Sequence, residues 1–211
     1  MVGGAELSHP YDCCVYLLDL GELVLIDSGA GESFDDLVRN IERLGFDARR
    51  VSTVLATHAH IDHIGSLHRF RDVFGARIAA HELDTDAIEC GGKVAAEAYG
   101  IDYSPCPVDL RIQGEEAGLR FSGIELKTVH IPGHTAGSLA AYLDMDGKRV
   151  LFGQDVHGPY YPGWDADPVQ ARLSLSRLIG LEADILCEGH FGIYRPASAV
   201  EKCIRQYLDS L

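Results

Sequence analysis

A six-residue segment of this 211-residue chain, His58-Ala59-His60-Ile61-Asp62-His63, contains three imidazoles and one carboxylate. Neutral imidazoles and carboxylates are the usual protein ligands of zinc and related divalent ions. The apolar run at 51–56 predicts a buried strand, so the segment directly follows a strand end. In an extended turn alternate residues point the same way, which lets the first two histidines face one ion and Asp62 and His63 a second. The alternative is the polar start of a helix with no bound metal.

The hydropathy pattern alternates between short strands and amphipathic helices. Apolar runs predict strands at residues 13–18, 23–26, 51–56, 77–80, 108–112, 124–130, 139–143, 149–152 and 185–187. Apolar positions at helical spacing predict helices at 34–44, 64–74, 84–99, 167–179 and 196–208, the third interrupted by Gly91-Gly92. Two strand-rich halves that each carry helices predict an α/β protein, a four-layer αββα sandwich of two mixed β-sheets flanked by helices. Because no repeat or interdomain linker is evident, residues 1–211 are expected to form a single domain.

Composition narrows the classes of function. The formal net charge of −14 argues against nucleic acid as a partner, because affinity for a phosphate backbone comes largely from Lys and Arg. No apolar run approaches the roughly 20 residues of a membrane span, and residues 1–12 lack the basic start and apolar stretch of a secretory signal. A soluble, cytoplasmic protein that does not bind membranes is therefore expected. The six cysteines include no C-x-x-C pair and are predicted to be reduced thiols.

The segment from His58 to His63 resembles the hallmark H-x-H-x-D-H motif of the metallo-β-lactamase superfamily, which also follows a core strand. Four further segments resemble that family's motifs in the same chain order: Val24-Leu25-Ile26-Asp27-Ser28-Gly29, Pro132-Gly133-His134-Thr135-Ala136-Gly137-Ser138, Phe152-Gly153-Gln154-Asp155 and Glu188-Gly189-His190. The resemblance extends over residues 13–191. It implies the metallo-β-lactamase fold, which has the αββα architecture that the strand and helix pattern predicts.

The resemblance also implies the ligands of a site for two divalent metal ions. His58, His60 and His134 would hold one ion, and Asp62, His63 and His190 would hold the other. Asp155 would bridge both, so that Asp62 and Asp155 are the carboxylates expected at the catalytic centre. Zinc is the expected metal, with iron or manganese as alternatives. Asp27 is expected beside the ligands, where it would hold the metal-binding turn in place, and a simple strand-end turn is the alternative.

The loop that follows Asp155 is rich in aromatic residues and includes His157, Tyr160 and Trp164. Such a loop can line a substrate cleft or pack in a dimer interface, and Tyr194 belongs to the same class. A loop histidine that only packs or is solvated is equally common, so the role of His157 stays open. Residues 83–116 look like a dispensable insert that sets specificity together with this loop.

Within the family, the full ligand set resembles the glyoxalase II and lactonase-like branch of metallohydrolases. The resemblance implies that a metal-bridging hydroxide attacks an ester, thioester or lactone carbonyl of a small-molecule substrate. Zinc β-lactamases usually replace the bridging aspartate by Cys or Ser, so Asp155 argues against antibiotic hydrolysis. Glyoxalase II has an added C-terminal helical domain with basic glutathione contacts, whereas here only residues 191–211 follow His190. This difference argues against glutathione thioesters without removing them from the substrates that the branch implies.

Two functions of other classes remain open. A mononuclear iron oxygenase similar to the persulfide dioxygenases of the superfamily would use two histidines and one aspartate on a single iron. A nuclease resembling the superfamily's RNA-cutting members would need a basic exosite or an inserted domain, and neither is evident in the sequence. A homodimer is one possible assembly, and no motif identifies the substrate.

Overall fold

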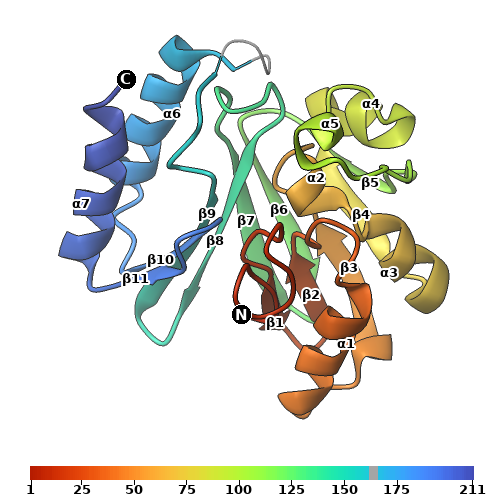
Figure 1. Cartoon of the computed structure of the whole chain (residues 1–211). Helices are drawn as coiled ribbons and strands as arrows, with labels where there is room; N and C mark the ends of the chain where they lie inside the picture. Colours follow the sequence, from red (N-terminus) through yellow and green to blue (C-terminus); the bar gives the residue numbers. More distant parts are fainter. Residues whose placement is uncertain (162–165) are drawn as a thin grey trace.

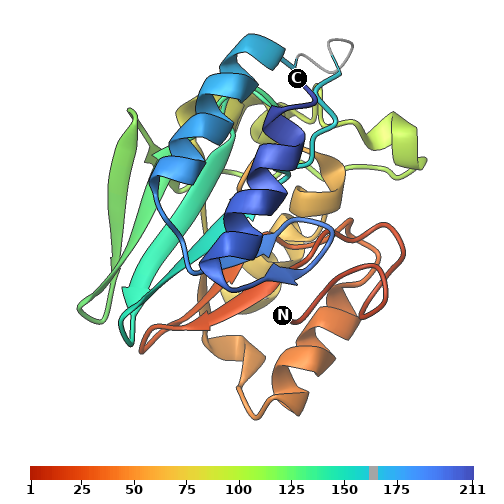
Figure 2. The same ribbon diagram turned by 90° about the vertical axis from the view of Figure 1, so that its left-hand side faces the viewer.

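The computed structural model describes residues 1–161 and 166–211, so Trp164 of the aromatic loop lies outside the described residues. Two β-sheets pack face to face, and helices cover the outer face of each sheet (Figures 1 and 2). In Figure 1 the helices α1, α3 and α4 lie on one side of the molecule, and α6 and α7 lie on the other. The four-layer αββα sandwich predicted from the sequence is therefore confirmed.

The first sheet contains five strands in the order β1-β2-β3-β4-β5. The strands β1 and β2 form an antiparallel hairpin, and β2 to β5 run parallel to one another. The helices α1 and α3 pack on its outer face, where the rings of Phe34 and Phe70 meet edge to face with centroids 5.0 Å apart. The elements of this half are β1 (Tyr16–Asp19), β2 (Leu23–Ile26), α1 (Phe34–Arg43), η1 (Ala48–Arg50), β3 (Val51–Leu55), α2 (Ile61–Ile64), α3 (Leu67–Phe74), β4 (Arg77–His81), α4 (Glu82–Cys90), α5 (Ala96–Tyr99) and β5 (Leu110–Ile112).

The second sheet contains six strands in the order β11-β10-β9-β8-β7-β6. The strands β9 and β10 are parallel, and the other neighbours are antiparallel. Its elements are β6 (Glu116–Phe121), β7 (Ile124–His130), β8 (Leu139–Met145), β9 (Lys148–Gln154), α6 (Pro168–Gly180), β10 (Ile185–Glu188), β11 (Ile193–Tyr194) and α7 (Ala197–Leu208). The carboxylate of Asp167 caps α6 by accepting from the backbone N–H groups of Val169 and Gln170, as the Asp-Pro sequence predicts.

Side chains of the central strands alternate between two apolar cores. Along β8, Leu139, Ala141 and Leu143 face the opposite sheet, whereas Ala140 and Tyr142 belong to the core beneath α6 and α7. Such strands are buried on both faces, which explains why they form continuous apolar runs in the sequence. Among the described residues, no helix is both long and apolar enough to cross a membrane.

Two strands were not predicted from the sequence. The strand β6 lies at the sheet edge, has β7 as its single partner among the described strands, and exposes alternate side chains to solvent. The strand β11 is only two residues long. Neither contains the continuous apolar run that identified the central strands.

Candidate metal centre

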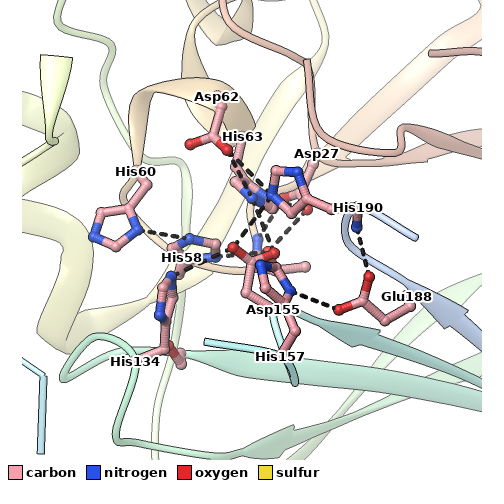
Figure 3. Close-up of polar contacts among 12 residues, drawn as sticks. Asp27, His58, His60, Asp62, His63, His134, Asp155, His157, Glu188 and His190 are labelled. Carbon is pink, nitrogen blue, oxygen red and sulfur yellow. Dashed lines mark hydrogen bonds and ion pairs between the residues drawn. The ribbon is translucent and has the colours of Figure 1, made fainter. Parts of the chain in front are cut away.

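The seven ligand candidates converge at one end of the two sheets, each in a segment that follows a strand (Figure 3). The residues His58 and His60 follow β3, and α2 then carries Asp62 and His63. The second sheet contributes the other three: His134 after β7, Asp155 after β9, and His190 after β10. The candidates therefore come from both sheets and lie where the sheets meet.

The first group of candidates consists of His58, His60 and His134. One ring nitrogen from each lies within 4.8 Å of the others, and all three side chains are buried. Burial lowers the pKa of His58 and His134 and lowers that of His60 to about 3. The rings are therefore neutral at physiological pH, which is the form that binds a metal ion.

The second group consists of Asp62, His63, Asp155 and His190, again with ligand atoms within 4.8 Å of one another. The Nε2 atom of His190 lies 3.2 Å from Asp62 and 3.3 Å from Asp155. Burial lowers the pKa of His190, but Asp155 and Asp62 outweigh it and raise the pKa to about 10. The two carboxylates make this part of the site strongly negative, which attracts cations. Only glycine fits at position 189, next to His190, because a Cβ there would lie 2.2 Å from Asp155 Oδ1.

Asp155 lies between the two groups. One carboxylate oxygen is 3.2 Å from His63 Nε2, and the other is 3.5 Å from His134 Nε2. The nearby His63 and His190 outweigh the effect of burial and hold the pKa of Asp155 well below its usual value. An ionised carboxylate thus faces histidines of both groups, as a bridging ligand would.

Unpaired polar atoms test whether these residues fit metal ions. Among the described residues, His63 Nε2, His134 Nε2 and Asp155 Oδ1 are buried and make no contact with hydrogen-bond geometry, although the first and the third lie 3.2 Å apart. Buried polar atoms are nearly always paired, and these three converge on the same small volume. Imidazole and carboxylate donors suit zinc, iron and manganese. The residues therefore fit divalent cations.

Asp27 orients one of the ligand candidates, His63. Its Oδ2 atom lies 2.8 Å from Nδ1 of His63, which points the Nε2 atom of that ring into the cluster. The carboxylate is itself held by the backbone N–H of Thr57 at 2.7 Å and its hydroxyl at 2.8 Å. A carboxylate on the far nitrogen of a ligand histidine fixes its tautomer and orientation. The structure thus brings Asp27 beside the ligand candidates.

The model of the metallo-beta-lactamase superfamily matches residues 10–190 of the sequence. The chain belongs to this superfamily. Hydroxyacylglutathione hydrolase GloC of Haemophilus influenzae is 25% identical over 206 residues, which are 94% of this chain and 93% of that protein.

A hydroxyacylglutathione hydrolase of Pseudomonas putida is 27% identical over 163 residues, which are 72% of this chain and 53% of that protein. This superfamily member thus aligns with little more than half the length of that relative. The crystal structure of the metallo-beta-lactamase GOB-18 from Elizabethkingia meningoseptica superposes with a TM-score of 0.76 at 25% identity. The match covers 95% of this chain and 84% of that one.

Asp84 is a buried carboxylate that sequence analysis missed in this superfamily member. It accepts hydrogen bonds from Ala59 N at 2.9 Å, Thr135 Oγ1 at 2.7 Å and Gly137 N at 2.7 Å. Ala59 separates His58 from His60, and Thr135 follows His134, so Asp84 ties together the two loops that carry the first group. Describing residues 83–116 as a dispensable insert was therefore wrong at this position. No sequence signal distinguished Asp84 from an ordinary acidic residue in the first turn of a helix.

A cavity of about 210 Å³ opens over the ligand candidates. Besides the ligand candidates His60, Asp62, His134, Asp155 and His190, its described lining consists of Ala95, Tyr99, His157 and Pro159. The sequence interpretation included His157 but missed Tyr99, which lies on the short helix α5. Tyr160 and Tyr194, expected as cleft residues, do not line the described cavity.

Both tyrosines are occupied in other ways. The hydroxyl of Tyr160 donates to the carbonyl of Val156 at 3.1 Å, and its ring packs against the core beneath α6 and α7. Tyr194 lies on β11 and packs against the same core. Both rings therefore contribute to the hydrophobic core rather than to the cavity over the ligand candidates.

Proposed function

We propose that this superfamily member is a binuclear metal-dependent hydrolase that cleaves an ester, thioester or lactone carbonyl. The observation that carries the proposal is the position of Asp155, whose two carboxylate oxygens face histidines of both ligand groups. A shared carboxylate between two complete groups is the arrangement expected for two adjacent ions, with zinc as the first candidate.

Different residues of the chain would bind the ions, orient a ligand and enclose the substrate in such a reaction. When bound, two divalent ions supply a water molecule whose pKa falls from 15.7 to about 7 and a positive charge for the carbonyl oxygen. The neutral rings of the first group are ready to bind, because burial keeps their pKa low. Asp27 keeps His63 aimed at the centre. Tyr99 and Pro159 help to enclose the reacting groups, and no serine or cysteine nucleophile is needed.

The lining of the cavity favours a small substrate without a strongly anionic group at the centre. Within the part of the chain that the structure describes, no Lys or Arg lines the cavity. Phosphodiesters and nucleic acids are normally bound through such cations, and the net charge of −14 repels them. We therefore place an uncharged carbonyl substrate ahead of a phosphodiester.

Metal content and a substrate panel test the proposal together. Protein purified without added metal is analysed by plasma emission spectroscopy and assayed with a thioester, a lactone, an aryl ester and a phosphodiester. We expect two equivalents of metal per chain and turnover of a carbonyl substrate, lost in Asp155→Asn and retained in the exposed control Asp86→Ala. One equivalent of iron with oxygen uptake on a persulfide would instead identify the oxygenase.

A further inference from the structure

His81 and His130 form a stacked pair of imidazole rings that joins the two sheets. His81 is the last residue of β4 in the first sheet, and His130 is the last residue of β7 in the second. The ring centroids are 3.9 Å apart, and the ring planes differ by 8°. His81 is 2% exposed, and its Nε2 atom has no partner with hydrogen-bond geometry among the described residues. Neither ring is among the ligand candidates.

His81 also caps the helix that carries Asp84. It is the N-cap residue of α4, and its Nδ1 atom accepts from the backbone N–H of Leu83 at 3.4 Å. Because Nδ1 accepts, the proton of the neutral ring is on Nε2. Asp84 lies in the first turn of α4, where the backbone depends on the cap. The cap therefore supports the carboxylate that joins the loops of the first ligand group.

His130 supports the same arrangement from the other sheet. Its Nε2 atom donates to the carbonyl of Ala136 at 2.8 Å. Ala136 lies in the loop that follows His134, between the two residues of this loop that donate to Asp84. The stacked pair therefore supports both sides of the contact between Asp84 and the loop.

A second proton on the ring of His81 would disrupt the cap. This proton goes to Nδ1, so an N–H group would face the backbone N–H that Nδ1 now accepts from. An imidazolium at this place also opposes the positive end of the helix dipole. Burial, and then the neighbouring His130, lower the pKa of His81. The carbonyl of Gly114 and the carboxylates of Glu82 and Glu115 raise it by less, so the ring is neutral at physiological pH.

Charged groups from the neighbouring elements surround the pair. The Nδ1 atom of His130 lies 4.0 Å from Glu115 Oε1, and Arg177 donates to the backbone carbonyl of His130 at 3.3 Å. In the described part of the chain, the charged or titratable side chains that face the pair are Glu82 and Asp84 on α4, Glu115 before β6 and Arg177 on α6. Of these four, Asp84 also bonds to the loops of the first ligand group, so it connects the pair to that group.

We propose that His81 is a positioning residue that acts through Asp84 on the first ligand group, and that it loosens this group when it binds a proton in acid. His130 restrains this step, because two adjacent imidazolium rings repel each other. The inference rests on the metal centre of the proposed function. A structural role alone predicts that the effect of replacing His81 is the same at every pH, whereas the proposed role predicts that the benefit of His81 disappears in acid.

Zinc titrations of three proteins at neutral and acid pH measure this difference. His81→Asn keeps a side-chain oxygen that can accept at the N-cap but does not titrate, and His81→Leu has no acceptor. At neutral pH, the wild type and His81→Asn should bind the zinc equivalent that Asp84→Ala weakens about fivefold more tightly than His81→Leu, the usual value of one helix cap. In acid the wild type should approach His81→Leu, while His81→Asn keeps its advantage. Competition between zinc and protons at the ligands is common to all three proteins.

Two further variants distinguish the titration of His81 from other effects of pH. His130→Gln keeps a donor for the carbonyl of Ala136 but removes the second ring, so the acid loss of affinity should begin at a higher pH than in the wild type. The matched control His9→Asn changes a partly exposed histidine that contacts Tyr11 and Glu32, and it should follow the wild type at every pH.

Thermal melts of chelated protein give a readout that needs no metal. The pKa of His81 is lowered from 6.5 in the folded protein, so its contribution to stability is present above pH 6.5 and is lost as the pH falls below that value. The Tm should therefore fall in acid, and less so in His81→Asn. If no zinc binds, the metal centre of the proposed function fails and the melts still decide whether His81 titrates. The inference is overturned if the melts of wild type and His81→Asn have the same pH profile, or if the advantage in zinc affinity over His81→Leu is absent or does not change with pH.

Discussion

Replacing Asp84 by Ala tests how far the first ligand group depends on a residue that binds no metal. The change removes the shared acceptor of three buried donors, on Ala59, Thr135 and Gly137. Burial raises the pKa of Asp84 more than these hydrogen bonds lower it. The ionised carboxylate is therefore not itself a net source of stability near neutral pH. The expected loss comes from leaving three donors without a partner.

The size of this loss follows from the number of donors. Each buried donor left unpaired costs about 1–3 kcal/mol, and relief of the buried charge favours the lower end, so the free energy of unfolding should fall by about 3 kcal/mol. For a chain of this size that corresponds to a decrease in Tm of roughly 6–12 °C. The loops that carry His58, His60 and His134 also lose the hydrogen-bond acceptor that connects them. Metal affinity at this group should therefore fall by about 10–100-fold.

Thermal melts and zinc titrations against a chromophoric chelator measure the two effects. The matched control is Asp86→Ala, an exposed position on the same helix α4, which should change neither quantity. Weaker binding of one zinc equivalent, with the other nearly unchanged, would support the conclusion that Asp84 positions the loops of the first ligand group. Wild-type affinity for both equivalents in a destabilised Asp84→Ala protein would refute the reasoning, because Asp84 would then support only the fold.

Three further predictions concern residues of the candidate metal centre. Asp155→Ala should abolish turnover and weaken retention of both ions, and unchanged metal content by plasma emission would rule out the bridging role. Asp27→Asn should lower affinity for one ion by about 10–100-fold, because it disturbs the carboxylate that orients His63, and a chelator titration checks this. Burial lowers the pKa of His190, but the neighbouring carboxylates raise it from 6.5 to about 10 in the metal-free protein. Its contribution to stability is then present below pH 6.5 and lost as the pH rises toward 10, so the Tm of chelated protein should fall over that range, and less so in His190→Gln.

The sequence was most informative where function depends on residues close together in the chain. The segment from His58 to His63 places four ligand candidates after one strand, and local hydropathy was enough to locate that strand. The remaining candidates His134, Asp155 and His190 could be assigned only through the family resemblance, because each alone is an ordinary polar residue in a loop. The structure then brings all of them to one place.

Residues that act through distant partners were not predictable from the sequence. Asp84 bonds to residues 25, 51 and 53 positions away, and His81 stacks against His130 of the other sheet. Nothing in their local sequence indicates these partners, since the contacts exist only after the two sheets have packed. The edge strand β6 was missed for a related reason: its stability comes from pairing with β7 rather than from an apolar run of its own.

The packing of the two sheets is also what makes the centre possible. The first sheet supplies His58, His60, Asp62 and His63, and the second supplies His134, Asp155 and His190, so each ligand group takes members from both. Protein contacts set this alignment: the backbone N–H of Leu139 donates to Thr57 O at 2.8 Å, and that of Cys14 donates to Gly189 O at 2.6 Å. Ligand candidates divided in this way can meet around one ion only when the sheets are in register. We therefore expect metal affinity and the stability of sheet packing to be linked, because ions that bind only the packed state must stabilise it.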